Sequence, residues 1–302
     1  MRINLFEAVP NCQYFKPNPS LVPVLRSFAI VRSLLTITVV LIFIVAANAY
    51  STAQTWTLVW SDEFNGAAGS PVDSTKWVFD TGGSGWGNNE LEYYTNSTAN
   101  ASMDGNGNLV ITAIKETVPG KKRCWYGRCQ YSSARIKTAG NFKRAYGRFE
   151  ARIKIPYGQG IWPAFWMLGS NINKVGWPRC GEIDVMENIG REPSIAHGTI
   201  HGPGYSGASG IGAAYNLPAG AFAAEFHVFA IEWEPGAIRW YVDGNLYETR
   251  TQADLPAGAE WVFDHPFFML LNVAVGGNWP GNPDATTVSP QKMYVDYVRV
   301  YQ

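Results

Sequence analysis

Charge is scarce in this 302-residue chain, and no excess of positive charge favours a polyanionic partner. Asp, Glu, Lys and Arg make up 16% of the residues, and the formal net charge is zero. Four of the 24 basic residues but one of the 24 acidic residues lie in positions 1–53, so the remainder carries a net charge of −3. Nucleic-acid binding requires a basic surface that neutralises phosphates, so we expect no nucleic-acid partner. The same balance argues against a polysulfated polysaccharide as substrate.

Cysteine and histidine are also few, with four of each. Cys12 lies near the N-terminus. Cys124 and Cys129 flank four residues and could close a small loop in an oxidising compartment, although their spacing does not fix the geometry. Cys180 has no obvious partner and fits a small buried hydrophobic residue. Three cysteines without histidine at ligand spacing do not make a zinc site.

One apolar run is present near the N-terminus, but it is short for a membrane span. Residues 34–45 are apolar apart from two threonines, follow Arg26 and Arg32, and precede Ala47-Asn48-Ala49. A basic region, an apolar run and a small-residue cleavage site are typical of a secretory signal. A bilayer span needs about 20 residues. We therefore expect residues 1–49 to be a leader with an over-extended start, and an uncleaved anchor is the alternative. We expect the mature protein to be extracellular or periplasmic, with no stable membrane partner.

Sustained helical periodicity, internal repeats and linkers are all absent from residues 54–302. Short alternating or apolar segments occur instead, separated by turns rich in glycine and proline (31 and 18 residues). The expected strands cover residues 56–60, 109–114, 149–155, 238–242, 267–275 and 293–301. Asp243-Gly244 predicts a hairpin turn after the fourth of these. Many short strands predict a single all-β domain over residues 54–302, a sandwich or a barrel.

The chemistry concentrates in Glu182-Ile183-Asp184-Val185-Met186-Glu187. In a regular strand Glu182 and Asp184 share a face and Glu187 points to the other one. A β-bulge near Val185 and Met186 would return Glu187 to the face of the first two acids. Two carboxyl groups about 5–5.5 Å apart suit a retaining glycosidase, in which one attacks the anomeric carbon and the other protonates the leaving oxygen. A solvated acidic face and a calcium site are the alternatives.

These six residues resemble the active-site signature of glycoside hydrolase family 16. Two residues between Asp184 and Glu187 resemble its laminarinase-like branch. Four further blocks agree in collinear order, so that the resemblance runs from about residue 56 to residue 301. They are Trp86-Gly87-Asn88-Asn89-Glu90, the segment 160–168, His197-Gly198-Thr199-Ile200-His201 and the segment 276–281.

The resemblance implies a fold and a reaction. The fold would be a jelly-roll (concanavalin A-like) β-sandwich of two antiparallel sheets with a concave substrate cleft. Glu182 would be the nucleophile, Glu187 the general acid/base and Asp184 an assisting carboxylate. The partner would be a β-glucan polysaccharide, cut internally at β-1,3 bonds by a monomer without a catalytic cofactor. Alternatives are a mixed-linkage β-1,3-1,4-glucanase, a galactan hydrolase, a transglycosylase or a non-catalytic glucan-binding protein.

The resemblance also implies substrate-binding residues. The chain has 12 tryptophans, and their flat rings could either stack on sugars or pack in the core. Trp162 and Trp166 lie four apart, so a regular strand places both on one face. His201 would lie on a strand beside the acids and contact the substrate or Glu187, while His197 is a weaker candidate. The remaining candidates are Asn88, Glu90, Arg135 and Trp279, each of which could instead have a structural role.

Many family members carry a structural calcium ion remote from catalysis. The matching positions here are Glu63 and Gly107, through backbone carbonyls, and Asp296 through its carboxylate. Asp296 could equally be an ordinary strand residue.

Overall fold

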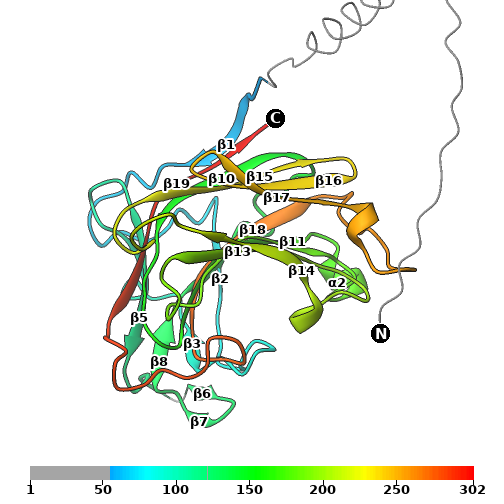
Figure 1. Cartoon of the computed structure of the whole chain (residues 1–302). Coiled ribbons are helices and arrows are strands. Elements are labelled where there is room, and N and C mark those ends of the chain that lie inside the picture. The colour runs from blue at the N-terminus through cyan, green and yellow to red at the C-terminus, as the bar shows by residue number, and fades with distance from the viewer. Residues whose placement is uncertain (1–54, 121) are drawn as a thin grey trace, which may run out of the picture. The chain divides into compact units, whose positions relative to one another are not determined.

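Two large antiparallel β-sheets pack face to face in the computed structural model, which describes residues 55–120 and 122–302 (Figure 1). Residues Trp56–Gln302 form one compact unit. The two-sheet sandwich predicted from the sequence is confirmed. The expected leader lies outside the described residues, and within them no helix is long and apolar enough to cross a membrane.

The ten-stranded sheet runs β17-β16-β15-β10-β19-β5-β8-β3, with β1 paired to β19 and β4 paired to β5. Its strands are β1 (Leu58–Asp62), β3 (Glu92–Tyr94), β4 (Ala101–Met103), β5 (Leu109–Lys115), β8 (Tyr131–Ser133), β10 (Gly147–Lys154), β15 (His227–Glu234), β16 (Ala237–Val242), β17 (Asn245–Thr251) and β19 (Gln291–Tyr301). Only β3 and β8 pair in parallel within the described residues.

The seven-stranded sheet runs β14-β13-β12-β11-β18-β9-β2. Its strands are β2 (Val78–Asp80), β9 (Arg135–Lys137), β11 (Ile161–Gly169), β12 (Glu182–Glu187), β13 (Ile195–His201), β14 (Ile211–Asn216) and β18 (Phe267–Val275). A separate hairpin joins β6 (Arg123–Cys124) to β7 (Gly127–Arg128). The described helical turns are α2 (Ile172–Val175), η1 (Gly207–Ser209) and η2 (Gln252–Asp254).

The core lies between the two sheets and leaves the opposite face of the seven-stranded sheet free for polar residues. In β11, Phe165 and Met167 alternate into the core, whereas Trp162 and Trp166 point to the other face. The central strand β18 is buried along its whole length, as its uncharged sequence predicts. We call the face opposite the core the outer face of the seven-stranded sheet.

Local sequence signals account for several of these elements. Asp243 and Gly244 both have positive φ (50° and 78°) between β16 and β17, which is the geometry of a type I′ hairpin turn. Cys124 and Cys129 form a disulfide that closes the β6–β7 hairpin, and Cys180 is a free, fully buried thiol. The first expected strand is displaced, because β1 begins at Leu58 rather than at Trp56.

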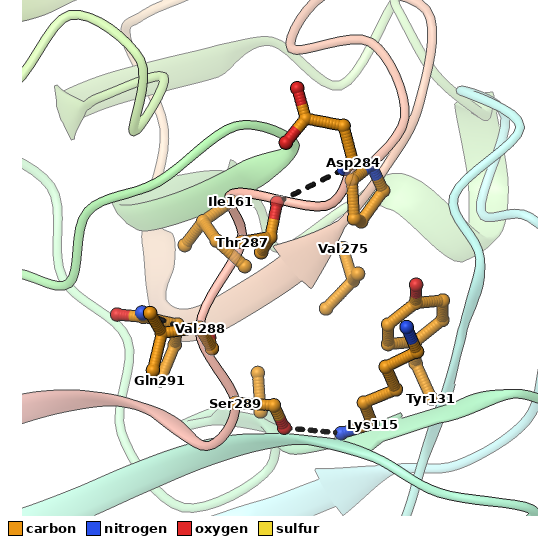
Figure 2. A pocket seen from close by; sticks show the side chains of 11 residues that line it. Lys115, Tyr131, Ile161, Val275, Asp284, Thr287, Val288, Ser289 and Gln291 are labelled. Carbon is orange, nitrogen blue, oxygen red and sulfur yellow. Dashed lines mark hydrogen bonds between the residues drawn. The ribbon is translucent and has the colours of Figure 1, made fainter.

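A small cavity of about 20 Å³ lies beneath the loop that precedes β19 (Figure 2). Its polar wall is already paired, since the Lys115 backbone N–H donates to Ser289 Oγ (2.8 Å) and that of Asp284 to Thr287 Oγ1 (3.1 Å). This volume suits about one water molecule rather than a sugar ring.

Candidate active site

The acidic strand β12 contains the bulge that the spacing of its carboxylates requires. Against β11, Glu187 pairs with Ala164 and Met186 with Phe165, but the next partner, Trp166, pairs with Asp184. Val185 is therefore the extra residue. Both Val185 and Met186 pack in the core (2% and 0% exposed). The bulge predicted near these two residues is confirmed, and it turns Glu187 to the side of Glu182 and Asp184.

Asp184 and His201 form a close pair next to Glu182. His201 Nε2 lies 3.1 Å from Asp184 Oδ2 and 4.0 Å from Glu182 Oε1. The register explains this proximity, because β13 pairs with β12 so that His201 lies directly opposite Glu182. Asp184 is 2% exposed, whereas 17% of the Glu182 side chain remains accessible.

Burial raises the pKa values of all three acids, and neighbouring carboxylates add to the rise for Glu182 and Glu187. Burial, and then the charge of Asp184, raises the pKa of Glu182 to about 8. Burial likewise raises the pKa of Asp184 to about 8, opposed by its hydrogen bond with Glu182. Burial and the charges of Asp184 and Glu182 raise the pKa of Glu187 well above its ordinary value. The site therefore holds protons at neutral pH, and a hydrogen bond between two carboxyls requires one of them to be protonated.

Two indole N–H groups point at the outer carboxylates. Trp162 Nε1 donates to Glu187 Oε1 (3.0 Å), and Trp177 Nε1 donates to Glu182 Oε2 (2.6 Å). Ligand atoms of Glu182, Asp184 and His201 lie within 4.8 Å of one another, which could hold a metal ion. Calcium sites surround their carboxylates with further oxygen ligands. Indole donors on two of the acids instead suit carboxyl groups that act on a substrate.

Trp166, which lies opposite Asp184 in the strand register, begins a chain of hydrogen bonds through a second group of polar residues. Its Nε1 donates to Asn272 Oδ1 (2.7 Å), Asn272 Nδ2 donates to Tyr94 Oη (3.1 Å), and Tyr94 Oη donates to Glu90 Oε2 (3.2 Å). Asn88 Nδ2 completes the chain by donating to Glu90 Oε1 (3.1 Å). Three of the predicted residues, Trp166, Glu90 and Asn88, thus belong to one network.

Arg135 lies between two aromatic rings on the same side of the sheet. Its guanidinium carbon is 4.7 Å from the centre of the Trp166 ring and 4.8 Å from that of Trp86. Its Nε lies 3.1 Å from Asp80 Oδ2, so the charge is paired as well as stacked. This arrangement forms a flat, rigid wall that leads from β11 to the loop after β2.

Trp279 and His197 lie at the Glu187 end of the acidic strand. The Trp279 ring meets Trp162 edge-on (5.6 Å between centres) and His197 edge-on (5.0 Å). His197 pairs with Glu187 across the strands. Trp279 is 36% exposed, so it can offer a ring face to a ligand.

Sequence reasoning missed four residues of this site, including Tyr94 of the hydrogen-bond chain and Trp86, whose ring stacks on Arg135. Trp177 lies in the loop before β12 and is 48% exposed. The Trp177-Pro178 pair lies only five residues before Glu182, and this closeness in sequence was a signal that Trp177 belongs to the site. Asn272 is a buried amide (7% exposed) within the otherwise apolar strand β18. A lone polar residue in such a strand points to a buried hydrogen-bond network.

The three predicted calcium positions lie on β19 or just beyond the ends of strands that pair with it. Asp62, which precedes Glu63, pairs with Val298, and Leu109, two residues after Gly107, pairs with Val295. Both of these strands pair along β19, which carries Asp296. The Asp296 carboxylate already binds Arg152 (Nη1 to Oδ2, 2.5 Å).

Known proteins are similar to this chain in sequence and in fold. Residues 87–299 match the profile of Glycosyl hydrolases family 16. A β-glucanase from Rhodothermus marinus is 42% identical over 263 residues, which cover 83% of this chain and 86% of the relative. The endo-β-1,3-glucanase structure from Pyrococcus furiosus is 53% identical with a TM-score of 0.78, covering 83% of this chain and 96% of that one.

A third comparison gives the same result. The laminarinase catalytic domain from Thermotoga maritima MSB8 is 52% identical with a TM-score of 0.77, covering 82% of this chain and 99% of that domain. The predicted jelly-roll sandwich is confirmed by these structures. The chain belongs to Glycosyl hydrolases family 16 and is a glycoside hydrolase.

Proposed function

We propose that the protein is a retaining endo-β-1,3-glucanase, with Glu182 as nucleophile and Glu187 as general acid/base. The observation that carries the proposal is the bulge in β12, which puts three carboxyl groups on one face of one strand. The β-1,3 linkage is supported by the activities of the Pyrococcus and Thermotoga relatives.

In the first step Glu182 forms a bond to the anomeric carbon while the glycosidic C–O bond breaks. Glu187 gives its proton to the departing oxygen, so its raised pKa suits this role. Glu182 attacks as the anion, and the Trp177 indole N–H stabilises that charge by donating to Glu182 Oε2.

In the second step water attacks the anomeric carbon and gives a proton to Glu187. The bond between the sugar and Glu182 breaks as the water oxygen bonds to that carbon, and two successive inversions preserve the β configuration. His201, beside Asp184, is positioned to keep that carboxyl in place through both steps.

The proposal is tested by the products and by the choice of polymer. We expect reducing ends to appear on laminarin faster than on lichenan and agarose, with a rapid fall in viscosity. Proton NMR should show the β anomer first. Initial release of the α anomer would contradict the double displacement, and faster turnover of lichenan or agarose would reassign the linkage. Products longer than the substrate would indicate a transglycosylase.

Replacing Trp177 with Phe keeps an aromatic ring but removes the N–H that lowers the pKa of Glu182. Because the nucleophile must be deprotonated, the acidic limb of the pH–rate profile is expected to move to higher pH. A hydrogen bond to a charged group contributes about 1.5–3 kcal/mol, so kcat at neutral pH should fall about tenfold to a hundredfold. An unshifted acidic limb would show that Trp177 serves only as a sugar platform.

We also propose a structural calcium ion at Glu63, Gly107 and Asp296. Backbone carbonyls and a carboxylate are suitable hard ligands, and the ion pair with Arg152 uses Oδ2, leaving Oδ1 for a cation. Saturating Ca²⁺ is expected to raise the Tm by about 5 °C or more relative to EGTA, as follows from ligand linkage.

The variant Asp296→Asn should lose this response to Ca²⁺. Glu63→Gln is the matched control, because it removes the ion pair with Arg299 but preserves the backbone carbonyl. Equal Tm values in Ca²⁺ and EGTA for the unmutated protein would exclude the ion.

We propose, finally, that the protein is secreted as a monomer after cleavage behind Ala49. The disulfide between Cys124 and Cys129 supports an oxidising compartment. N-terminal sequencing of the exported protein and its elution volume in size-exclusion chromatography test the two statements.

A further inference from the structure

A second hollow, distinct from the acidic site, lies beside the disulfide-closed hairpin β6–β7. Its volume is about 660 Å³, and it is shallow and open to solvent. It is lined by residues 82–84, Tyr93 and residues 122–125. In Figure 1 the hairpin lies beside β3 and β8. None of these residues takes part in the proposed reaction, so the hollow requires a separate account.

Trp125 is exposed in this hollow yet firmly fixed. The side chain is 52% exposed, although its Nε1 donates to the Glu90 backbone oxygen (2.8 Å). Its backbone N–H donates to the Gly83 oxygen (2.8 Å). The neighbouring Tyr126 donates its hydroxyl to the Leu91 oxygen (2.6 Å). A large aromatic ring that is held in place before binding loses little entropy when a ligand stacks on it.

Polar donors surround this aromatic surface. Lys122 lies over the Tyr93 ring (5.2 Å from Nζ to the ring centre), and Arg123 is exposed beside it. An apolar ring together with several N–H donors suits a pyranose, which has an apolar face and a rim of hydroxyl groups.

The hollow continues directly from the wall of the active site. Trp86, whose ring stacks on Arg135, also donates its Nε1 to the Gly82 oxygen (3.3 Å), and Gly82 lines the hollow. Gly83 bridges to Cys124 of the hairpin. A row of contacts therefore leads from Trp166 through Arg135 and Trp86 to Trp125, along the β2 end of the seven-stranded sheet.

We propose that the hollow at Trp125 is an additional sugar subsite, which binds glucosyl residues of the same β-glucan chain beyond those bound at the acidic site. This inference rests on the proposed function. It makes long chains better substrates than short ones, because only a long chain reaches both the acids and Trp125. The disulfide closes the hairpin that carries Trp125, and the hydrogen bonds of Trp125 and Tyr126 hold it against the loop that carries Glu90.

The test compares kcat/KM on β-1,3-glucan oligosaccharides, from the shortest one cleaved to the longest available, and on laminarin. Trp125→Ala is expected to lower kcat/KM about tenfold on the long substrates, which is the magnitude of one apolar pocket contact. The kcat/KM on the short substrates should not change. Trp125→Phe should retain most of the activity on long chains, because it keeps a ring. Leu246→Ala is the control, since Leu246 is equally exposed (53%) but lies on β17, at the opposite edge of the ten-stranded sheet from β3.

Two results would overturn the inference. Unchanged kinetics of Trp125→Ala on every chain length would mean that the hollow binds no sugar. An equal loss on short and long substrates, shared by Trp125→Phe, would mean that Trp125 only supports the Glu90 loop through its N–H. Failure of the proposed function is distinguishable, because then the unmutated enzyme would release no sugar from laminarin. That outcome would overturn this inference too.

Discussion

Replacing Glu182 with Ala is expected to lower kcat on laminarin by about ten-thousand-fold or more. The covalent intermediate cannot form without the nucleophilic carboxylate, and loss of a nucleophile leaves only residual catalysis from binding and from the remaining groups. The measurement is release of reducing sugar at saturating substrate. Glu234→Ala is the control and should retain full activity. Glu234 lies on β15 of the ten-stranded sheet, where its carboxylate pairs with Arg239.

The Glu182→Ala variant also permits a direct test of the chemistry. The space of the missing carboxylate can admit a small anion such as azide or formate. We expect the anion to restore part of the activity on a glucoside with a good leaving group, and the glycosyl azide formed to have the α configuration. One displacement then replaces two, so the configuration inverts. A β product in azide would show that Glu182 is not the attacking group.

The raised pKa of Glu182 also predicts how stability depends on pH. Its pKa in the folded protein is about 8, against an ordinary value of 4.5. The folded state therefore holds this proton more tightly than the unfolded chain, and the protein loses stability as pH rises through that interval. Glu182→Gln removes this titration, so its Tm should exceed that of the unmutated enzyme near neutral pH and fall less from pH 5 to pH 8. Parallel Tm profiles would contradict the raised pKa.

The sequence predicted a bulge in the acidic strand, because the acids and the apolar residues cannot both follow a strict two-residue alternation. Alternation alone would turn Glu187 into the core, whereas Val185 and Met186 are both apolar and both require burial. An extra residue in the strand resolves the conflict, and the structure places it at Val185. Asp243-Gly244 likewise predicted the β16–β17 turn, because few other residue pairs accept positive φ at two successive positions.

Contacts between segments distant in sequence could not be predicted in this way. The chain from Trp166 through Asn272 and Tyr94 to Glu90 joins residues up to 182 positions apart, and no local pattern specifies their order. The spacing of Cys124 and Cys129 left their pairing open. It also gave no sign that the hairpin would pack against the Glu90 loop, because that contact depends on the Gly83–Cys124 bridge.

Replacing Glu187 with Ala is expected to give a different result from replacing Glu182, since the need for an acid depends on the leaving group. A sugar alkoxide leaves poorly without a proton, so kcat on laminarin should fall by about a hundredfold to ten-thousandfold. The dinitrophenolate of a dinitrophenyl glucoside leaves readily without a proton. Formation of the glycosyl-enzyme from this substrate should therefore be nearly unaffected. A burst of phenolate followed by slow turnover is the expected signature, because water must then attack without a general base.

The two acids can be separated further by pH and by an added nucleophile. The basic limb of the pH–rate profile, which reports loss of the Glu187 proton, should disappear in Glu187→Ala while the acidic limb of Glu182 remains. Azide needs no general base, so it should accelerate the slow second step and yield a β-glycosyl azide, of retained configuration because Glu182 is still present. Equal losses on laminarin and on the dinitrophenyl glucoside, without a burst, would contradict the acid role. They would mean instead that the Trp162–Glu187 hydrogen bond serves to shape the site.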